Sequence, residues 1–200
     1  MNKPNLLFPT PVWTMQLENF KKINEEMYEY IKEEQQKDEK GISKSNVRGW
    51  HSNDFNLDDN KPQKFISFIT PAIEQVMTDM NWDKIKQNAK INNMWAIINI
   101  GGSTNLRHQH GNSTISGAYY VRAPERAGDI IFYDPRPAPV YSHPNVEAPN
   151  LLNAQVNGIK PKEGALVLFP SYLDHSVNEN LSNKERIVIS FNIRIQIKSK

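Results

Sequence analysis

The chain of 200 residues contains no cysteine, which excludes disulfide bonds, thiolate metal sites and cysteine nucleophiles. It also lacks an apolar run of about 18 residues, the length that a membrane-spanning helix requires. The first residues, Met1–Pro9, do not contain the apolar segment of a signal peptide. We therefore expect a cytoplasmic protein that has no membrane partner.

An excess of charge of one sign is also missing. Lysine and arginine number 24 and aspartate and glutamate 22, which gives a net charge of +2. The basic residues are spread along the chain, whereas nucleic-acid-binding surfaces concentrate them on one face, so we expect no nucleic-acid partner. Hydrophobic residues make up 38% of the chain, as in a folded globular protein. The length and the absence of a repeat or linker indicate a single domain over residues 1–200.

Two helices are expected in the N-terminal part, about residues 1–90. Residues 17–38 carry apolar side chains at steps of three and four, with Glu and Lys between them, which predicts an amphipathic surface helix. A second helical region has its apolar side chains on one face, namely those of Phe65, Ile69, Ile73, Val76, Met77 and Met80. Pro71 lies within it, so the helix either begins or kinks there.

After residue 90, short β-branched or aromatic runs bounded by Gly, Pro, Asn and Asp predict strands. The expected strands are Asn92–Ile100, Ser113–Val121, Gly128–Tyr133, Gly164–Phe169 and Arg186–Ile195. Helices followed by many short strands indicate an α+β fold. In this fold the strands, about residues 91–197, close into a sandwich or barrel that the helices buttress.

The last expected strand has one apolar face and one polar face. The polar face carries Arg186, Ser190, Asn192 and Arg194 among its residues. On a half-exposed strand this face would turn toward water. Alternatively, it lines the inside of a barrel that binds an anionic ligand. The sequence leaves both interpretations open.

Three of the five histidines form the pattern that points most directly to chemistry. His108 and His110 point to the same side if the segment is extended. His175 follows an expected buried strand and a turn. Imidazoles that converge from such positions can hold iron, zinc or copper in an open site. We therefore expect a metal at these three residues, the alternative being inert histidines in polar loops. His51 and His143 lie in polar loops and are interpreted as structural or surface residues.

The segment Phe132-Tyr133-Asp134-Pro135-Arg136 follows another expected strand. Aspartate and proline favour a turn there. The two aromatic residues and the arginine around Asp134 also allow a contact with substrate, or a carboxylate near the metal.

Seven segments occur in an order that identifies a family resemblance. They are Leu7-Phe8-Pro9-Thr10-Pro11-Val12, Gly49-Trp50-His51-Ser52, His108-x-His110, Ser116-Gly117-Ala118-Tyr119-Tyr120, Phe132-x-Asp134-Pro135-Arg136, Phe169-Pro170 and His175-x-Val177. In this ordered set the chain resembles the 2-oxoglutarate/Fe(II)-dependent oxygenases of bacteria and phages, from about residue 6 to about residue 195.

The resemblance implies a double-stranded β-helix (jelly-roll, cupin-like) core and a set of iron ligands. In the family's pattern the first ligand maps onto His108 and the last onto His175. Position 110 is histidine where most such enzymes have Asp or Glu. Either three histidines bind the iron, or Asp134 or water supplies the remaining position. Some jelly-roll relatives, such as aspartyl β-hydroxylases, lack the carboxylate ligand and resemble this chain around Arg107-His108.

The resemblance also implies Fe(II) and 2-oxoglutarate as cofactors and O2 as co-substrate. The products would be succinate, CO2 and a hydroxylated substrate, either a peptidyl residue such as proline or a small molecule. Arg186 would pair with the far carboxylate of 2-oxoglutarate, with Arg194 as its competitor. Further cofactor contacts are expected from Tyr120, Ser190 and Asn192. Asp134 and Arg136 would face the substrate.

Two other functions remain open in the sequence. One is a three-histidine dioxygenase that does not use 2-oxoglutarate, and the other is a jelly-roll binding or structural protein without catalysis. Loop 136–150 is long and polar, and we expect it to form a lid over the substrate. Loop 39–61 carries Trp50, which should pack on the barrel or on a second subunit, so a homodimer is also considered.

Overall fold

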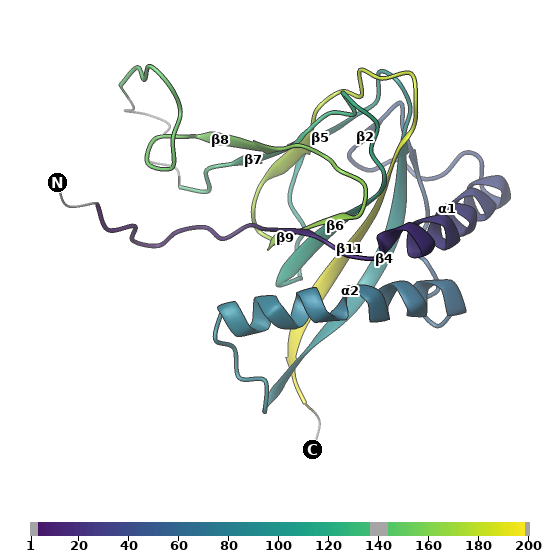
Figure 1. Ribbon diagram of the computed structural model, residues 1–200, viewed down its shortest axis with the longest axis horizontal. Coiled ribbons are helices and arrows are strands. Elements are labelled where there is room, and N and C mark those ends of the chain that lie inside the picture. Colours follow the sequence, from purple (N-terminus) through teal and green to yellow (C-terminus); the bar gives the residue numbers. More distant parts are fainter. Residues whose placement is uncertain (1–3, 137–143, 199–200) are drawn as a thin grey trace.

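The computed structural model describes residues 4–136 and 144–198. It contains two antiparallel sheets that face each other (Figure 1). The six-stranded sheet has the order β1-β9-β6-β11-β4-β3, with β1 (Trp13–Gln16), β9 (Ala165–Pro170), β6 (Ile115–Arg122), β11 (Arg186–Ile197), β4 (Gln87–Asn99) and β3 (Trp50–His51). The five-stranded sheet has the order β2-β5-β10-β7-β8, with β2 (Asn46–Val47), β5 (Thr104–His108), β10 (His175–Val177), β7 (Ile130–Tyr133) and β8 (Val156–Ile159). This is the expected jelly roll.

Two helices cover the outer face of the six-stranded sheet (Figure 1). They are α1 (Phe20–Lys37) and α2 (Asn60–Asp79), and both are the amphipathic helices expected from the sequence. Helix α2 begins well before Pro71 and continues through it. Phe65 of α2 packs on Tyr119 of β6, with ring centroids 5.0 Å apart, in the core between helices and sheet.

Strand β11 lies at the centre of the six-stranded sheet, paired with β4 and β6. Ile187, Ile189 and Phe191 are buried in the core beneath the helices. Arg186 and Asn192 lie on the opposite face and line a cavity between the sheets. The structure therefore supports the barrel-interior interpretation of this polar face.

All five expected strands are present, with shifted ends. Strands β1, β2, β3, β5, β8 and β10 have two to five residues each and were not expected. Such short segments show too few alternations to stand out from loops.

The two long loops have different outcomes. Trp50 packs into the core as expected, and its Nε1–H donates to the carbonyl of Asp38 over 2.8 Å. The expected lid, 136–150, includes residues 137–143, which lie outside the described residues, so it stays a prediction. Within residues 4–136 and 144–198, no helix has both the length and the hydropathy of a membrane span.

Candidate metal centre

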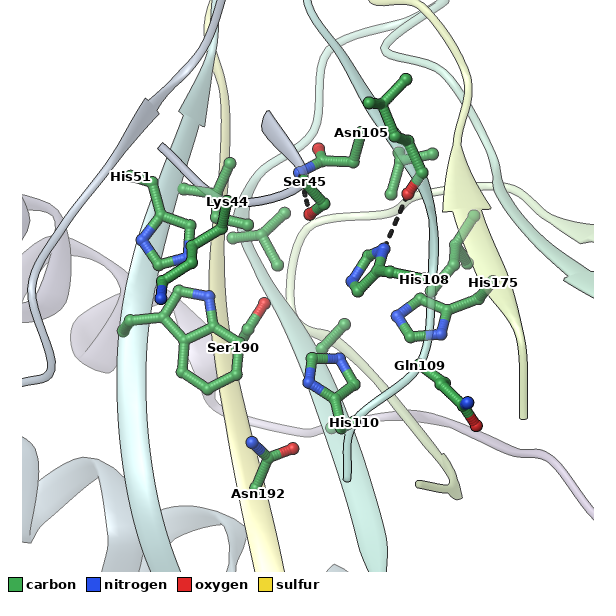
Figure 2. A pocket seen from close by; sticks show the side chains of 18 of the residues that line it. Lys44, Ser45, His51, Asn105, His108, Gln109, His110, His175, Ser190 and Asn192 are labelled. Carbon is green, nitrogen blue, oxygen red and sulfur yellow. Dashed lines mark hydrogen bonds between the residues drawn. The ribbon is translucent and has the colours of Figure 1, made fainter. Parts of the chain in front are cut away.

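Three histidines meet in the cavity between the sheets (Figure 2). Nitrogen atoms of His108, His110 and His175 all lie within 4.8 Å of one another. The ring centroids of His108 and His175 are 4.3 Å apart, and that of His110 is 5.1 Å from each of them. The structure thus brings together the three residues that the sequence singled out.

Pairing between β5 and β10 places two of these histidines. His175 is the partner of His108 across the ladder, but Val177 is the partner of Asn105, so β5 contains one extra residue between the two pairs. Such a bulge breaks the alternation of side chains. Asn105 and His108, which flank the bulge, both line the cavity.

Backbone carbonyls orient the rings. His108 Nδ1 lies 2.7 Å from the carbonyl oxygen of Leu106, and His175 Nδ1 lies 3.0 Å from that of Leu173. A carbonyl can only accept a hydrogen bond, so each Nδ1 carries the proton and each Nε2 is left as a ligand atom. His110 is anchored through its backbone N–H, which donates to the carbonyl of Ser171 over 2.9 Å.

All three imidazoles are neutral near pH 7. Burial, with a smaller effect of the neighbouring histidines, lowers the pKa of His110 to about 3. Burial, followed by the proximity of His108, lowers the pKa of His175 to about 4. Burial also lowers the pKa of His108. Neutral imidazole is the form that binds metal ions, so this donor set fits Fe(II). In the part of the chain that the structure describes, no Asp or Glu belongs to the cluster.

Arg186 lies in the same cavity, which has a volume of about 810 Å³. Its side chain is 1% exposed, and burial lowers the pKa of its guanidinium to about 10. Nη1 makes the hydrogen bonds of this side chain to the described protein residues, donating to the carbonyls of Ala127 and Gly128 and, over 3.5 Å, to that of Asn178. Among the described residues no carboxylate forms an ion pair with Arg186, so Nε and Nη2 remain available for an anionic ligand. A buried cation of this kind favours a bound carboxylate.

Tyr120 lies close to Arg186 and also lines the cavity. Burial raises the pKa of its hydroxyl to about 12, against a lowering effect of Arg186. The hydroxyl therefore stays protonated and able to donate a hydrogen bond at neutral pH. The expected contact between Tyr120 and the cofactor stays a prediction.

The other expected cofactor residues lie farther along the cavity. Ser190 is four positions from Arg186 and Asn192 six, which corresponds to roughly 13 and 20 Å along a strand. Asn192 is also engaged within the protein: it accepts from Ser116 Oγ over 2.7 Å and donates to Asn93 Oδ1 over 3.1 Å. A five-carbon dicarboxylate anchored at Arg186 does not span the distance to Asn192.

Two expected site residues, and the competitor of Arg186, do not line this cavity. Arg194 is exposed and donates to the carbonyl of Asn112 over 2.8 Å. Asp134 forms an ion pair with Arg136, 2.7 Å between Oδ2 and Nη2, at a second cavity beside the N-terminal segment. Neither residue lines the cavity that holds the three histidines or belongs to their cluster, so the structure does not bring Asp134 or Arg136 to the metal centre.

His51 and Trp95 line the cavity although the sequence analysis did not place them there. Their rings are stacked, with centroids 5.7 Å apart and an angle of 6°. His51 was interpreted as a structural or surface residue because it lies in a polar loop of the sequence. Strand β3 has only two residues and gives no periodicity that would reveal it. The segment Gly49-Trp50-His51-Ser52, which contributed to the family resemblance, was the available signal. His143 lies outside the described residues.

Comparison with known sequences identifies one family. The family described as 2OG-Fe(II) oxygenase, where 2OG is 2-oxoglutarate, matches residues 93–192, half of the chain. No curated protein matches the sequence.

Three solved structures share the fold of this chain. A prolyl-4-hydroxylase from Pseudomonas putida is 11% identical, with a TM-score of 0.63 over 92% of each chain. A viral collagen prolyl hydroxylase from Paramecium bursaria Chlorella virus-1, solved with 2OG, is 14% identical, with a TM-score of 0.59 over 91% of this chain and 94% of that one. HygX from Streptomyces hygroscopicus, with nickel, 2-oxoglutarate and hygromycin B bound, is 9% identical, with a TM-score of 0.62 over 92% and 83%.

Proposed function

Because the chain belongs to the 2OG-Fe(II) oxygenase family, we propose that it hydroxylates a substrate in the cavity between its two sheets. His108, His110 and His175 would hold Fe(II), and Arg186 would anchor 2-oxoglutarate. The observation that carries this proposal is that three neutral imidazoles and one buried, unneutralised guanidinium line the same cavity.

The residues of this chain would bind and orient the cofactors and keep water out of the site. Bound Fe(II) with 2-oxoglutarate supplies the oxidising chemistry that uses O2 and releases succinate and CO2. Arg186 offers a planar fork to the far carboxylate, with Nη1 fixed by backbone carbonyls, and Tyr120 adds a hydroxyl donor. Phe169 packs against His175, with ring centroids 4.7 Å apart, and keeps water from that side of the metal ligands.

We propose as substrate either a peptidyl residue such as proline or a small molecule. Two similar structures are prolyl hydroxylases, and a third holds hygromycin B, so the shared fold supports both classes. Asp134 and Arg136 have no part in this proposal, because their ion pair lies at the second cavity. We further propose a cytoplasmic location, since a reducing compartment keeps iron as Fe(II) and the chain has no cysteine.

Calorimetry and a turnover screen test the function. We expect the metal-free protein to bind Mn(II) or Ni(II), and 2-oxoglutarate to bind once the metal is present. Turnover of a panel of peptides and metabolites with Fe(II) and ascorbate should then form succinate. Oxygen uptake that does not depend on 2-oxoglutarate would favour a three-histidine dioxygenase, and failure to bind any of these metals would contradict the proposal.

A further inference from the structure

A fourth histidine, His51, lies in the same cavity and has no part in the chemistry described so far. Its side chain is 6% exposed and belongs to the lining of the cavity. Figure 2 shows it across the cavity from His108 and His175, beside Lys44. A buried histidine in this position needs an explanation, because burying a polar group has a cost.

The protein places this ring through the pairing of β3 with β4. His51 is the partner of Ile97, and the neighbouring Trp50 turns into the core beneath the helices, so the alternation of side chains turns His51 toward the cavity. The next residue is held at two points: the backbone N–H of Ser52 donates to the carbonyl of Ala96 over 3.0 Å, and the backbone N–H of Ala96 donates to Ser52 Oγ over 2.9 Å.

These contacts determine which ring nitrogen is free. His51 Nδ1 lies 2.7 Å from the carbonyl oxygen of Ser52, so Nδ1 carries the proton and donates to it. Burial lowers the pKa of His51, which favours the neutral ring. Nε2 then keeps a lone pair, and it has no hydrogen-bond partner among the described residues. Stacking on Trp95 explains the plane of the ring, and the Ser52 bond explains Nδ1, but neither gives a partner to Nε2.

The surroundings indicate what that partner would be. Lys44 and Asp54 line the cavity with opposite charges, and the carboxamides Asn53 and Asn93 also line it. Lys44 lowers and Asp54 raises the pKa of His51, so both charges act on this ring. Balanced charges and carboxamides suit an uncharged polar ligand better than an ion.

We propose that His51 is a substrate-orienting residue whose Nε2 accepts a hydrogen bond from an N–H or O–H group of the substrate. The substrate is then an uncharged molecule with an amide N–H or a hydroxyl near the carbon that reacts. This inference rests on the proposed function, because it takes the neighbouring histidines as the metal site.

The test uses the full chain loaded with Zn(II) and 2-oxoglutarate and labelled with ¹⁵N in its histidine rings. NMR then reports the protonation and hydrogen bonding of each ring nitrogen, which a purely structural role of His51 would leave unchanged on addition of ligand. The probes are a capped tripeptide, N-acetyl-Gly-Pro-Gly amide, and glycerol. They separate an amide donor from a hydroxyl donor.

Two variants identify the signal and test its meaning. His51→Phe keeps a flat ring against Trp95 but removes the acceptor, and the signals that it loses are those of His51. His51→Gln offers an amide oxygen instead. The thermal midpoint of each variant reports whether it is folded, and the Gln variant keeps the test valid if the Phe variant does not fold.

We expect one probe to shift His51 Nε2 while Nδ1 stays protonated. Its affinity should be about 3- to 10-fold weaker in His51→Phe, the worth of one hydrogen bond, and less affected in His51→Gln. If neither probe shifts Nε2, or if the folded variants bind as the wild type does, the inference is wrong. Failure of the wild type to bind 2-oxoglutarate would instead count against the proposed function.

Discussion

Replacing Arg186 by lysine should weaken the binding of 2-oxoglutarate while leaving metal binding nearly unchanged. In the structure Nη1 of Arg186 is held by the carbonyls of Ala127 and Gly128, which leaves Nε and Nη2 for a ligand. Lysine keeps the positive charge but has a single nitrogen on its side chain. That nitrogen cannot satisfy the two carbonyls and also present a fork to a carboxylate.

The size of the effect follows from the bond that is lost. A hydrogen bond between charged groups is worth about 1.5–3 kcal/mol, so the loss of one should raise the Kd for 2-oxoglutarate roughly 10- to 100-fold. The metal affinity should change little, because a guanidinium offers no lone pair to a metal and the three histidines would be its ligands.

Isothermal titration of the Ni(II)-loaded protein with 2-oxoglutarate measures this change. Arg194→Lys is the matched control, since Arg194 lies on the same strand but is exposed and bonded to the carbonyl of Asn112. The control should bind 2-oxoglutarate as the wild type does. If Arg194→Lys shows the loss and Arg186→Lys does not, the reasoning is refuted.

Three further predictions concern the metal and the stability of the fold. His110→Ala should weaken Mn(II) binding by more than about 100-fold, beyond the effect of losing an indirect contact, and near-normal affinity in calorimetry would remove His110 from the ligand set. The folded-state pKa values of His110 and His175, about 3 and about 4, lie below the unfolded value of about 6.5, so protons bind preferentially to the unfolded chain as the pH falls. Urea unfolding of the metal-free protein should therefore show a loss of about 2 kcal/mol from pH 7 to pH 5, allowing for water in the cavity; an unchanged stability would contradict the buried, neutral state of these rings. Phe191→Ala, in the core beneath the helices, should cost about 3–5 kcal/mol in the same assay, and a loss below 1 kcal/mol would be incompatible with its complete burial.

The parts of the fold that depend on local periodicity could be predicted from the sequence. The apolar stripes of α1 and α2 and the alternation along β11 each extend over many residues, so their period is clear. Pro71 could not be interpreted from the sequence alone, because its effect depends on where the helix begins, and α2 begins at Asn60.

The candidate site could be predicted only in part, because its geometry depends on contacts between distant segments. The H-x-H spacing identified His108 and His110, but the bulge in β5 arises from pairing with β10 and leaves no local signal. His51 enters the cavity through a two-residue strand paired with β4. Asp134 follows an expected strand, and only the direction of that strand places it at the second cavity.

One face of strand β11 lies in the core beneath the helices, and the other face lines the ligand cavity. Correct pairing of this strand is therefore needed both for a stable fold and for a complete site. A slip of one residue in its pairing would turn Ser190 toward the helices and Ile189 into the cavity. The same error would therefore insert polar groups into the core beneath the helices and remove Arg186 from the ligand cavity. A stable molecule with a misregistered β11 is strongly disfavoured, so the fraction of chains that can bind 2-oxoglutarate should equal the fraction that is folded.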